Sequence, residues 1–216
     1  MHYAKVKLIE ISKILRGKHP YPRRYDQLYK ELVNMKARRF LEIGVNDGTN
    51  AVRLAKALQA VGVDAEYFGL DLFEYQKNES FLREFSLRVP SMETVESYLK
   101  RHGIKKPTLI AGDSTKVLPE VVPTFPKMDG IFIDGGHSYE TVLSDWNNVQ
   151  PLIDKHTVVF FDDYPNWGIK PVVDQIDRSK WDVQILPTSD QSKANPDFAD
   201  AHQKVMNFQL ARVQKL

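Results

Sequence analysis

Three aspartates follow two strongly apolar segments of the sequence and could do chemistry together. Asp134 ends the run MDGIFID, and Asp162 and Asp163 end the run TVVFFDD. If the two runs are neighbouring parallel strands, their ends lie about 5 Å apart and the three carboxylates should converge. Carboxylates this close repel one another unless a cation or a basic group neutralises them. We therefore predict a cation site rather than helix caps or solvated loop acids, with Mg²⁺ the simplest ion and Mn²⁺ or Ca²⁺ as alternatives.

His137 lies three residues after Asp134 in the segment IDGGHSY. Its imidazole could act as a general base near neutral pH or as an additional metal ligand. It could equally cap the following helix or hydrogen-bond a carboxylate as a neutral strut. The sequence leaves these interpretations open.

A glycine-containing loop in FLEIGVNDGTN (40–50) follows another apolar segment. Ligands of open α/β sheets bind beyond the carboxyl ends of strands, and Gly44 and Gly48 would let the backbone approach a ligand closely. Thr49 or Asn50 could cap the next helix. Glu42 could orient loop amides or meet a cation. Because Asn46 takes the place of a middle glycine and Glu42 would repel a pyrophosphate, a nicotinamide dinucleotide is disfavoured.

Two further apolar runs end in an acid. Asp71 ends EYFGLD, where a carboxylate can accept both hydroxyls of a ribose. Asp113 and Ser114 end PTLIAGDS and could hydrogen-bond the edge of an adenine. The structural alternative for each is an ordinary solvated strand end.

The elements that must position these residues follow an α/β pattern. Apolar runs at 39–44, 66–71, 107–113, 128–134 and 157–163 are typical of strands covered on both faces, and helical spacing lies between most of them. Helices are expected near 25–35, 49–62, 79–88, 91–101 and 138–153, with a proline-broken basic connector at 18–25 after an N-terminal helix. The segments 181–187 and 202–214 predict a terminal hairpin.

Composition limits the class of protein. The 216 residues carry a net charge of +2, which provides no broad field for nucleic acid or membrane, and the chain has no cysteine. The N-terminus resembles neither a signal peptide nor a membrane span, so a cytoplasmic protein is expected. We predict a single domain over 1–216, in which 1–36 is a helical extension or lid and 72–106 covers the substrate. The N-terminal helix is a plausible surface for homo-oligomer formation.

Taken together, these motifs resemble the class I S-adenosylmethionine-dependent methyltransferases over roughly residues 25 to 214. FLEIGVNDGTN looks like their first motif, YFGLD their ribose-binding acid and LIAGDS their adenine contact. IDGGHSYETVLSDWNNVQPLI and VVFFDDY look like their fourth and fifth strand segments. Within the class, the chain is most similar to Mg²⁺-dependent small-molecule O-methyltransferases of the macrocin and novobiocin sugar type.

The resemblance implies a Rossmann-like sheet of seven strands, mostly parallel with an antiparallel C-terminal hairpin and helices on both faces. It implies Asp134, Asp162 and Asp163 as Mg²⁺ ligands and Asp134 or His137 as the base. It places S-adenosylmethionine on Glu42, Gly44, Asn46, Gly48, Thr49, Asn50, Asp71, Leu72, Gly112, Asp113, Ser114 and Asp134.

The expected reaction is metal-assisted O-methylation of a small-molecule hydroxyl with an adjacent oxygen. The rivals are a metal-independent N-methyltransferase and a noncatalytic protein that retains the cofactor fold.

Overall fold

The computed structural model describes residues 23–73, 90–188, 190–193 and 205–216. The expected N-terminal helix, the connector up to residue 22 and the expected helix at 79–88 lie outside these residues. Most of the polar stretch before the last strand lies outside them too.

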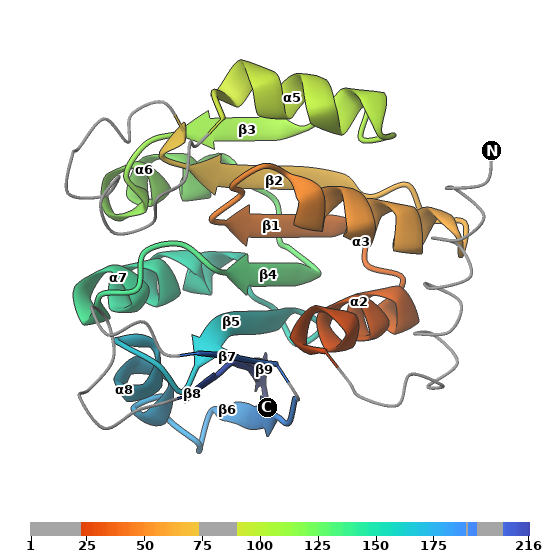
Figure 1. Cartoon of the computed structure of the whole chain (residues 1–216). Helices are drawn as coiled ribbons and strands as arrows, with labels where there is room; N and C mark the ends of the chain where they lie inside the picture. The colour runs from red at the N-terminus through yellow and green to blue at the C-terminus, as the bar shows by residue number, and fades with distance from the viewer. Residues whose placement is uncertain (1–22, 74–89, 189, 194–204) are drawn as a thin grey trace.

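The described chain is built on one sheet of seven strands in the order β3-β2-β1-β4-β5-β9-β6 (Figure 1). Strands β3, β2, β1, β4 and β5 run parallel, whereas β9 is antiparallel to both β5 and β6. The sheet strands are β1 (Arg39–Ile43), β2 (Glu66–Asp71), β3 (Thr108–Ala111), β4 (Gly130–Ile133), β5 (Val158–Tyr164), β6 (Trp181–Leu186) and β9 (Gln209–Lys215). This is the Rossmann-like sheet expected from the sequence, with its antiparallel C-terminal part.

Helices cover both faces of the sheet, as predicted (Figure 1). One buried cluster joins the sheet to α2 (Arg24–Met35), α3 (Thr49–Gln59) and α5 (Met92–Arg101). A second joins it to α6 (Ser114–Val121), α7 (Tyr139–Val149) and α8 (Ile169–Asp174). Two 3₁₀ turns, η2 (Val122–Thr124) and η3 (Gln150–Leu152), extend α6 and α7. Strand residues are therefore apolar throughout, because each face of the sheet packs against helices.

Serines set the starts of two predicted helices. Ser91 accepts a hydrogen bond from the amide of Thr94 at the start of α5, and Ser138 accepts one from the amide of Thr141 at the start of α7. Each side chain satisfies an amide that the first helical turn leaves unpaired.

The tail forms the predicted hairpin, because β6 pairs with β9 along its whole length. The chain between these strands adds a separate two-stranded ribbon of β7 (Gln191–Lys193) and β8 (Val205–Asn207). Among the described residues, no helix is both long and apolar enough to cross a membrane.

Candidate active site

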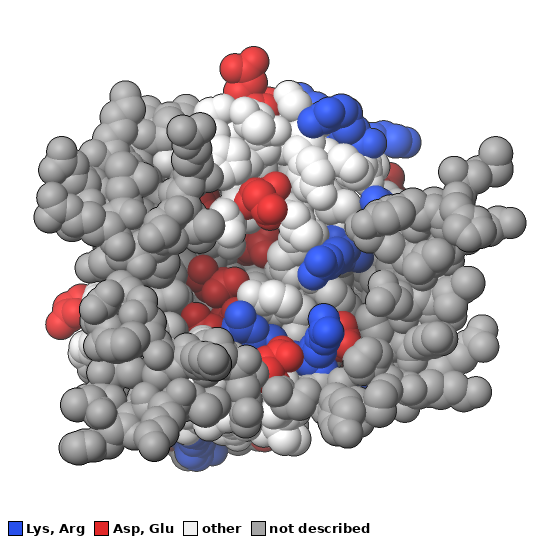
Figure 2. Space-filling view, viewed as in Figure 1, with Lys and Arg blue, Asp and Glu red and all other residues white. Residues whose placement is uncertain are grey.

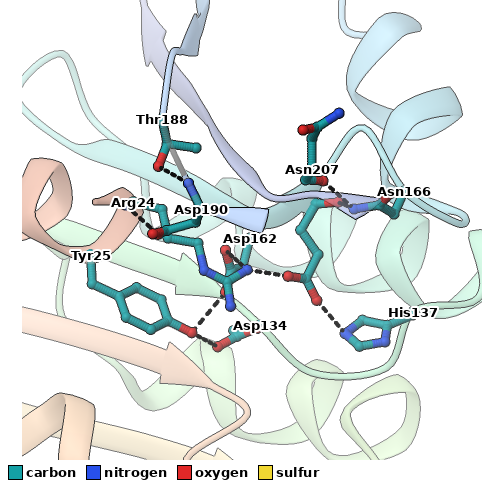
Figure 3. Close-up of polar contacts among 10 residues, drawn as sticks. Arg24, Tyr25, Asp134, His137, Asp162, Asn166, Thr188, Asp190 and Asn207 are labelled. Atoms are coloured by element: carbon teal, nitrogen blue, oxygen red, sulfur yellow. Dashed lines mark hydrogen bonds and ion pairs between the residues drawn. The ribbon is translucent and has the colours of Figure 1, made fainter. Parts of the chain in front are cut away.

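The three aspartates predicted to converge do meet at the carboxyl ends of β4 and β5. We call Asp134, Asp162 and Asp163 the carboxylate cluster. The Tyr25 hydroxyl lies 2.9 Å from Asp162 Oδ2 and 3.4 Å from Asp134 Oδ2, and Arg24 joins Asp162 to Asp163 (Figure 3). The cluster therefore occupies one site, as the neighbouring strand ends required.

A break in β5 lets two consecutive aspartates face the same way. Side chains alternate between the two faces of a regular strand, which would separate Asp162 from Asp163. The pairing of β5 with β9 shifts register between Phe161 and Tyr164, and Asp163 has a φ of 58°. Aspartate tolerates this left-handed conformation better than most residues do. The irregularity turns both carboxylates toward Arg24.

The first turn of α2 supplies two residues that the sequence analysis did not assign to the site. Arg24 Nη1 lies 2.9 Å from Asp162 Oδ1 and also contacts Asp163, while Tyr25 donates to Asp162 (Figure 3). The expected neutralising cation is here an arginine side chain. A signal for it was present, because Arg24 belongs to the basic connector beside the predicted helix at 25–35, and crowded carboxylates require a positive partner.

Burial and mutual repulsion shift the pKa values of the three carboxyl groups of the cluster to different extents. Burial, followed by the charge of Asp162, raises the pKa of Asp134 well above its usual value. Burial and the charge of Asp163 raise the pKa of Asp162 to about 6. Burial also opposes ionisation of Asp163, but the His137 hydrogen bond and the Arg24 charge outweigh it and lower that pKa. Asp163 is thus the member of the cluster that ionises most readily, and Asp134 is the member that most readily holds a proton.

His137 acts here as a partner of the cluster. Its Nε2 lies 3.2 Å from Asp163 Oδ2, and its ring stacks on Trp167 with 4.7 Å between ring centres and 5° between planes. The helix cap is Ser138 rather than His137. Trp167 is 39% exposed, so its ring forms a solvent-exposed wall beside His137. The imidazole is therefore held in place by a carboxylate on one side and an indole on the other.

One group of side chains in the described structure has the chemistry and spacing for a metal ion. Ligand atoms of Asp134, His137 and Asp163 all lie within 4.8 Å of one another. The geometry thus places His137 where the sequence analysis expected Asp162. In the space-filling view, acidic side chains extend down the middle of the face between the grey residues, and basic side chains lie among them and to their right (Figure 2).

The glycine loop touches the carboxylate cluster through backbone. Gly44 has a φ of 95°, and a Cβ at this position would lie 2.1 Å from the carbonyl oxygen of Asp134. The amide of Asp134 also donates to Ile43 O at 2.8 Å. Glycine is needed at position 44 because β1 and β4 approach too closely for a side chain. The predicted cofactor loop and the backbone of the acidic site are consequently in direct contact.

Gly48, rather than Thr49 or Asn50, is the N-cap residue of α3, with a φ of 76°. The amide of Thr49 donates instead to Asp47 Oδ1 at 2.9 Å. The expectation that Thr49 or Asn50 caps this helix is therefore wrong. A hollow of about 310 Å³ opens beside this turn, between Asp47 and Thr49 on one side and Thr94, Tyr98 and Arg101 of α5 on the other.

Glu42 lies beneath the loop rather than at its surface. It is 1% exposed and accepts hydrogen bonds from Asn50 Nδ2 and the Tyr67 hydroxyl, and Asn50 in turn accepts one from Tyr29. Burial raises the pKa of Glu42 to about 7, although both hydrogen bonds oppose the shift. In this structure Glu42 holds the side chain of Asn50 in the first turn of α3, rather than the loop amides that the sequence analysis named, and its contact with the cofactor stays a prediction.

The acid at the end of β2 also supports the loop. Asp71 accepts from the amide of Asn46 at 2.8 Å and from the amide of Phe73 at 3.0 Å. Leu72 follows it at the same edge and is partly buried. These bonds fix the carboxylate beside the loop, and its binding of a ribose stays a prediction.

Residues at the end of β3 start α6. The amide of Gly112 donates to Asp71 O at 2.9 Å, which aligns this strand end with β2. Asp113 accepts from the amide and hydroxyl of Thr115 and thereby caps the helix. Ser114 is buried at the first helical position. The predicted adenine contacts thus lie at the expected edge, with the Asp113 carboxylate engaged as a cap.

Asp145 is a buried carboxylate that the sequence analysis missed. It lies on α7 with no exposed surface, and neither oxygen has a hydrogen-bond partner within the part of the chain that the structure describes. Burial raises its pKa to about 7. The sequence did contain a signal for its burial, because its spacing places Asp145 beside Val142 and Trp146 on the inward face of the predicted helix.

The Methyltransferase domain family matches residues 41–164, which is more than half of the chain. No curated protein sequence gives a significant match.

Solved structures share the fold at low sequence identity. The O-methyltransferase from Bacillus cereus in complex with S-adenosylhomocysteine is 15% identical with a TM-score of 0.62, covering 97% of this chain and 91% of that one. The O-methyltransferase TomG from Streptomyces achromogenes, involved in tomaymycin synthesis and bound to S-adenosylmethionine, is 20% identical with a TM-score of 0.58, covering 96% and 89%. An rRNA methylase from Streptococcus thermophilus is 11% identical with a TM-score of 0.59, covering 90% and 98%.

The matched segment contains the glycine loop, the ends of β2, β3 and β4, and the paired aspartates of β5. The chain belongs to the Methyltransferase domain family and is a class I S-adenosylmethionine-dependent methyltransferase.

Proposed function

We propose that this enzyme transfers the methyl group of S-adenosylmethionine to a hydroxyl of a small molecule that carries a second oxygen beside it, with help from a divalent cation. The position of Asp134 carries the proposal. Its backbone packs against Gly44 of the cofactor loop, while its carboxylate belongs to the acidic site. A hydroxyl bound at the cluster would therefore lie next to the cofactor.

The side chains present fit a hard cation. Asp134 and Asp163 offer carboxylate oxygens and His137 an imidazole nitrogen, a set that suits Mg²⁺ or Mn²⁺. A bound cation would lower the pKa of a coordinated hydroxyl and fix the direction of its oxygen.

The protein's own residues supply alignment and proton transfer. Methyl transfer is an in-line displacement, so the rate depends on holding the acceptor oxygen opposite the leaving sulfur. The glycine loop and Asp71 would hold the cofactor from one side. Asp134 or His137 would take the hydroxyl proton, and Asp163 keeps the His137 ring oriented for this role.

A small acceptor fits the charge of the protein better than a nucleic acid does. The net charge of +2 supplies no extended basic surface for a phosphate backbone. The names of the Bacillus and Streptomyces proteins also favour oxygen as the acceptor atom. All three solved structures share only the fold with this chain, and the rRNA methylase is the least identical of them, at 11% against 15% and 20%.

The test is methyl transfer from isotope-labelled S-adenosylmethionine to sugars and catechol-like diols, with and without a chelator. We expect one hydroxyl of a diol to be methylated, loss of turnover with chelator, and recovery with Mg²⁺ or Mn²⁺. The same acceptors with one hydroxyl removed serve as matched controls. Turnover that persists in chelator would refute the metal role and leave O-methylation standing.

A second candidate is metal-independent N-methylation. The observation that favours it is Arg24, because its guanidinium nitrogen contacts two carboxylates of the cluster. A primary or secondary amine would be bound in the same way. Transfer to amines but to none of the diols, unchanged by chelator, would select this reaction.

A further inference from the structure

We infer that Arg24 is the resident cation of the carboxylate cluster, and that a divalent ion binds Asp134, His137 and Asp163 only by displacing this guanidinium. The inference rests on the proposed metal assistance, because it concerns the same carboxylates. The inference adds a feature that lies outside both the sequence motifs and the matched family segment, namely a positively charged side chain on the helix before β1.

The guanidinium and the metal group share a ligand. Arg24 contacts Asp163, which also belongs to the group of side chains spaced for a metal. It binds Asp162 at 2.9 Å as well, and Asp162 is 2% exposed. Two cations beside one buried carboxylate would repel strongly because little water screens them. The metal and Arg24 are therefore alternatives rather than companions.

Arg24 is built into the site and does not reach it as a loose surface side chain. Its guanidinium lies 4.8 Å from the centre of the Tyr25 ring and 5.0 Å from that of Phe208. Its backbone amide donates to Asp190 Oδ2 at 2.9 Å (Figure 3). Aromatic faces and a fixed backbone favour a cation at this position. An exposed ion pair would compete weakly with a metal, whereas this one competes well.

Displacement of the Arg24 guanidinium would also move Tyr25. Tyr25 follows Arg24 in the first turn of α2 and donates to Asp162 at 2.9 Å. Releasing Arg24 therefore loosens the contact between the start of α2 and the ends of β4 and β5. Metal binding and the docking of this helix are coupled through the same oxygens.

The experiment compares Arg24→Gln with the wild type in a titration with Mn²⁺ alone. Calorimetry on the full chain without cofactor gives the dissociation constant. We expect Arg24→Gln to bind Mn²⁺ at least about 10-fold more tightly than the wild type, because the carboxylates no longer have a competing charge. Arg24→Lys keeps the charge but loses the forked geometry, so its affinity should lie between the two.

Arg212→Gln is the matched control. Arg212 also bridges two carboxylates, at 2.9 Å from Glu31 and 3.3 Å from Asp182, and these acids lie outside the cluster. Its removal should leave Mn²⁺ affinity at the wild-type value. Thermal unfolding provides a second readout, in which Mn²⁺ should stabilise Arg24→Gln more than it stabilises the wild type.

Three outcomes separate this inference from the proposed function. Tighter Mn²⁺ binding by Arg24→Gln alone supports the competition. Equal binding by the wild type and Arg24→Gln overturns the competition and leaves metal assistance intact. Absence of binding in both overturns the competition and the metal role together. If Arg24→Gln does not fold, the same comparison is made between Arg24→Lys and the wild type, where equal affinity overturns the competition.

Discussion

Asp134 and Arg24 show what could and could not be predicted for single residues. Asp134, Asp162 and Asp163 were found because each ends an apolar strand, and strand ends of a parallel sheet share an edge. Arg24 is 138 positions from Asp162 in the chain, and its contact depends on how α2 docks. The need for a positive charge could be deduced, and the basic connector was a possible source, but which residue supplies the charge depends on the docking of α2. The assignments of Glu42, Asp71 and Asp113 to the cofactor remain predictions.

Asp145 should make stability depend on pH. Its folded-state pKa of about 7 is above the usual value of 3.8. A raised pKa adds stability at low pH, and this contribution is lost as pH rises toward the folded pKa. Asp145→Asn removes the effect, so its stability relative to the wild type should increase from about pH 5 to about pH 8, by roughly 1–3 kcal/mol.

Urea unfolding at the two pH values measures this change, with Asp113→Asn as control. The pKa of Asp113 is lowered by its bonds to Thr115, so its contribution is already complete above about pH 4. That variant should differ from the wild type equally at both pH values. A difference for Asp145→Asn that does not change with pH would contradict the assignment of a raised pKa.

The same contrast between predicted and unpredicted features holds for two elements, the turn after β1 and the irregular end of β5. The glycine loop was predicted because its residue types fit a strand-to-helix turn. The irregularity in β5 was not, although two consecutive aspartates directed at one ligand already require a break in strand alternation. The hairpin of β6 and β9 followed from two strand-like segments without a helix between them. The β7–β8 ribbon was not predicted, because β7 lay in a polar stretch and β8 lay within the segment 202–214 that was read as a single strand.

Gly44→Ala should disrupt the cofactor loop. The new Cβ would lie 2.1 Å from the Asp134 carbonyl oxygen, so backbone must move. We expect a loss of roughly 2–4 kcal/mol in the free energy of unfolding, combining the positive φ with overpacking. S-adenosylmethionine should bind at least about 10-fold more weakly by calorimetry, a loss of about 1.4 kcal/mol.

Gly62→Ala separates the two causes. Gly62 also has a positive φ, of 79°, but nothing lies within 4 Å of a Cβ built there. This variant should lose only about 1–2 kcal/mol and bind the cofactor as the wild type does. Equal effects of the two substitutions on cofactor binding would show that the close approach of β1 and β4 is unimportant.

Over the whole molecule, the sheet brings together residues from most of the chain. The predicted fold class, its covered faces and its antiparallel end agree with the structure, because apolar runs without alternation require helices on both sides. The division into a lid at 1–36 and a substrate cover at 72–106 stays a prediction. In the described structure these segments are represented mainly by α2, which contacts the carboxylate cluster, and by α5, which lines the hollow beside Asp47 and Thr49.

Cofactor binding should stabilise the entire domain. A ligand at about 100 times its dissociation constant adds about 2.7 kcal/mol, which raises the melting temperature by roughly 5–10 °C for a chain of this size. We expect this shift with S-adenosylmethionine and with S-adenosylhomocysteine in a thermal unfolding experiment. NADH is the control ligand and should produce none. A shift with NADH alone would contradict the interpretation of the glycine loop.

The position of β9 has a consequence for synthesis. This strand lies between β5 and β6, although both precede it in the sequence. A nascent chain that has emerged through β6 still lacks the partner that joins the two strands, and their edges are exposed for pairing with other chains. Translation of residues 209–215 is therefore the event that closes the sheet, and ribosome stalling before this point should yield an aggregation-prone intermediate.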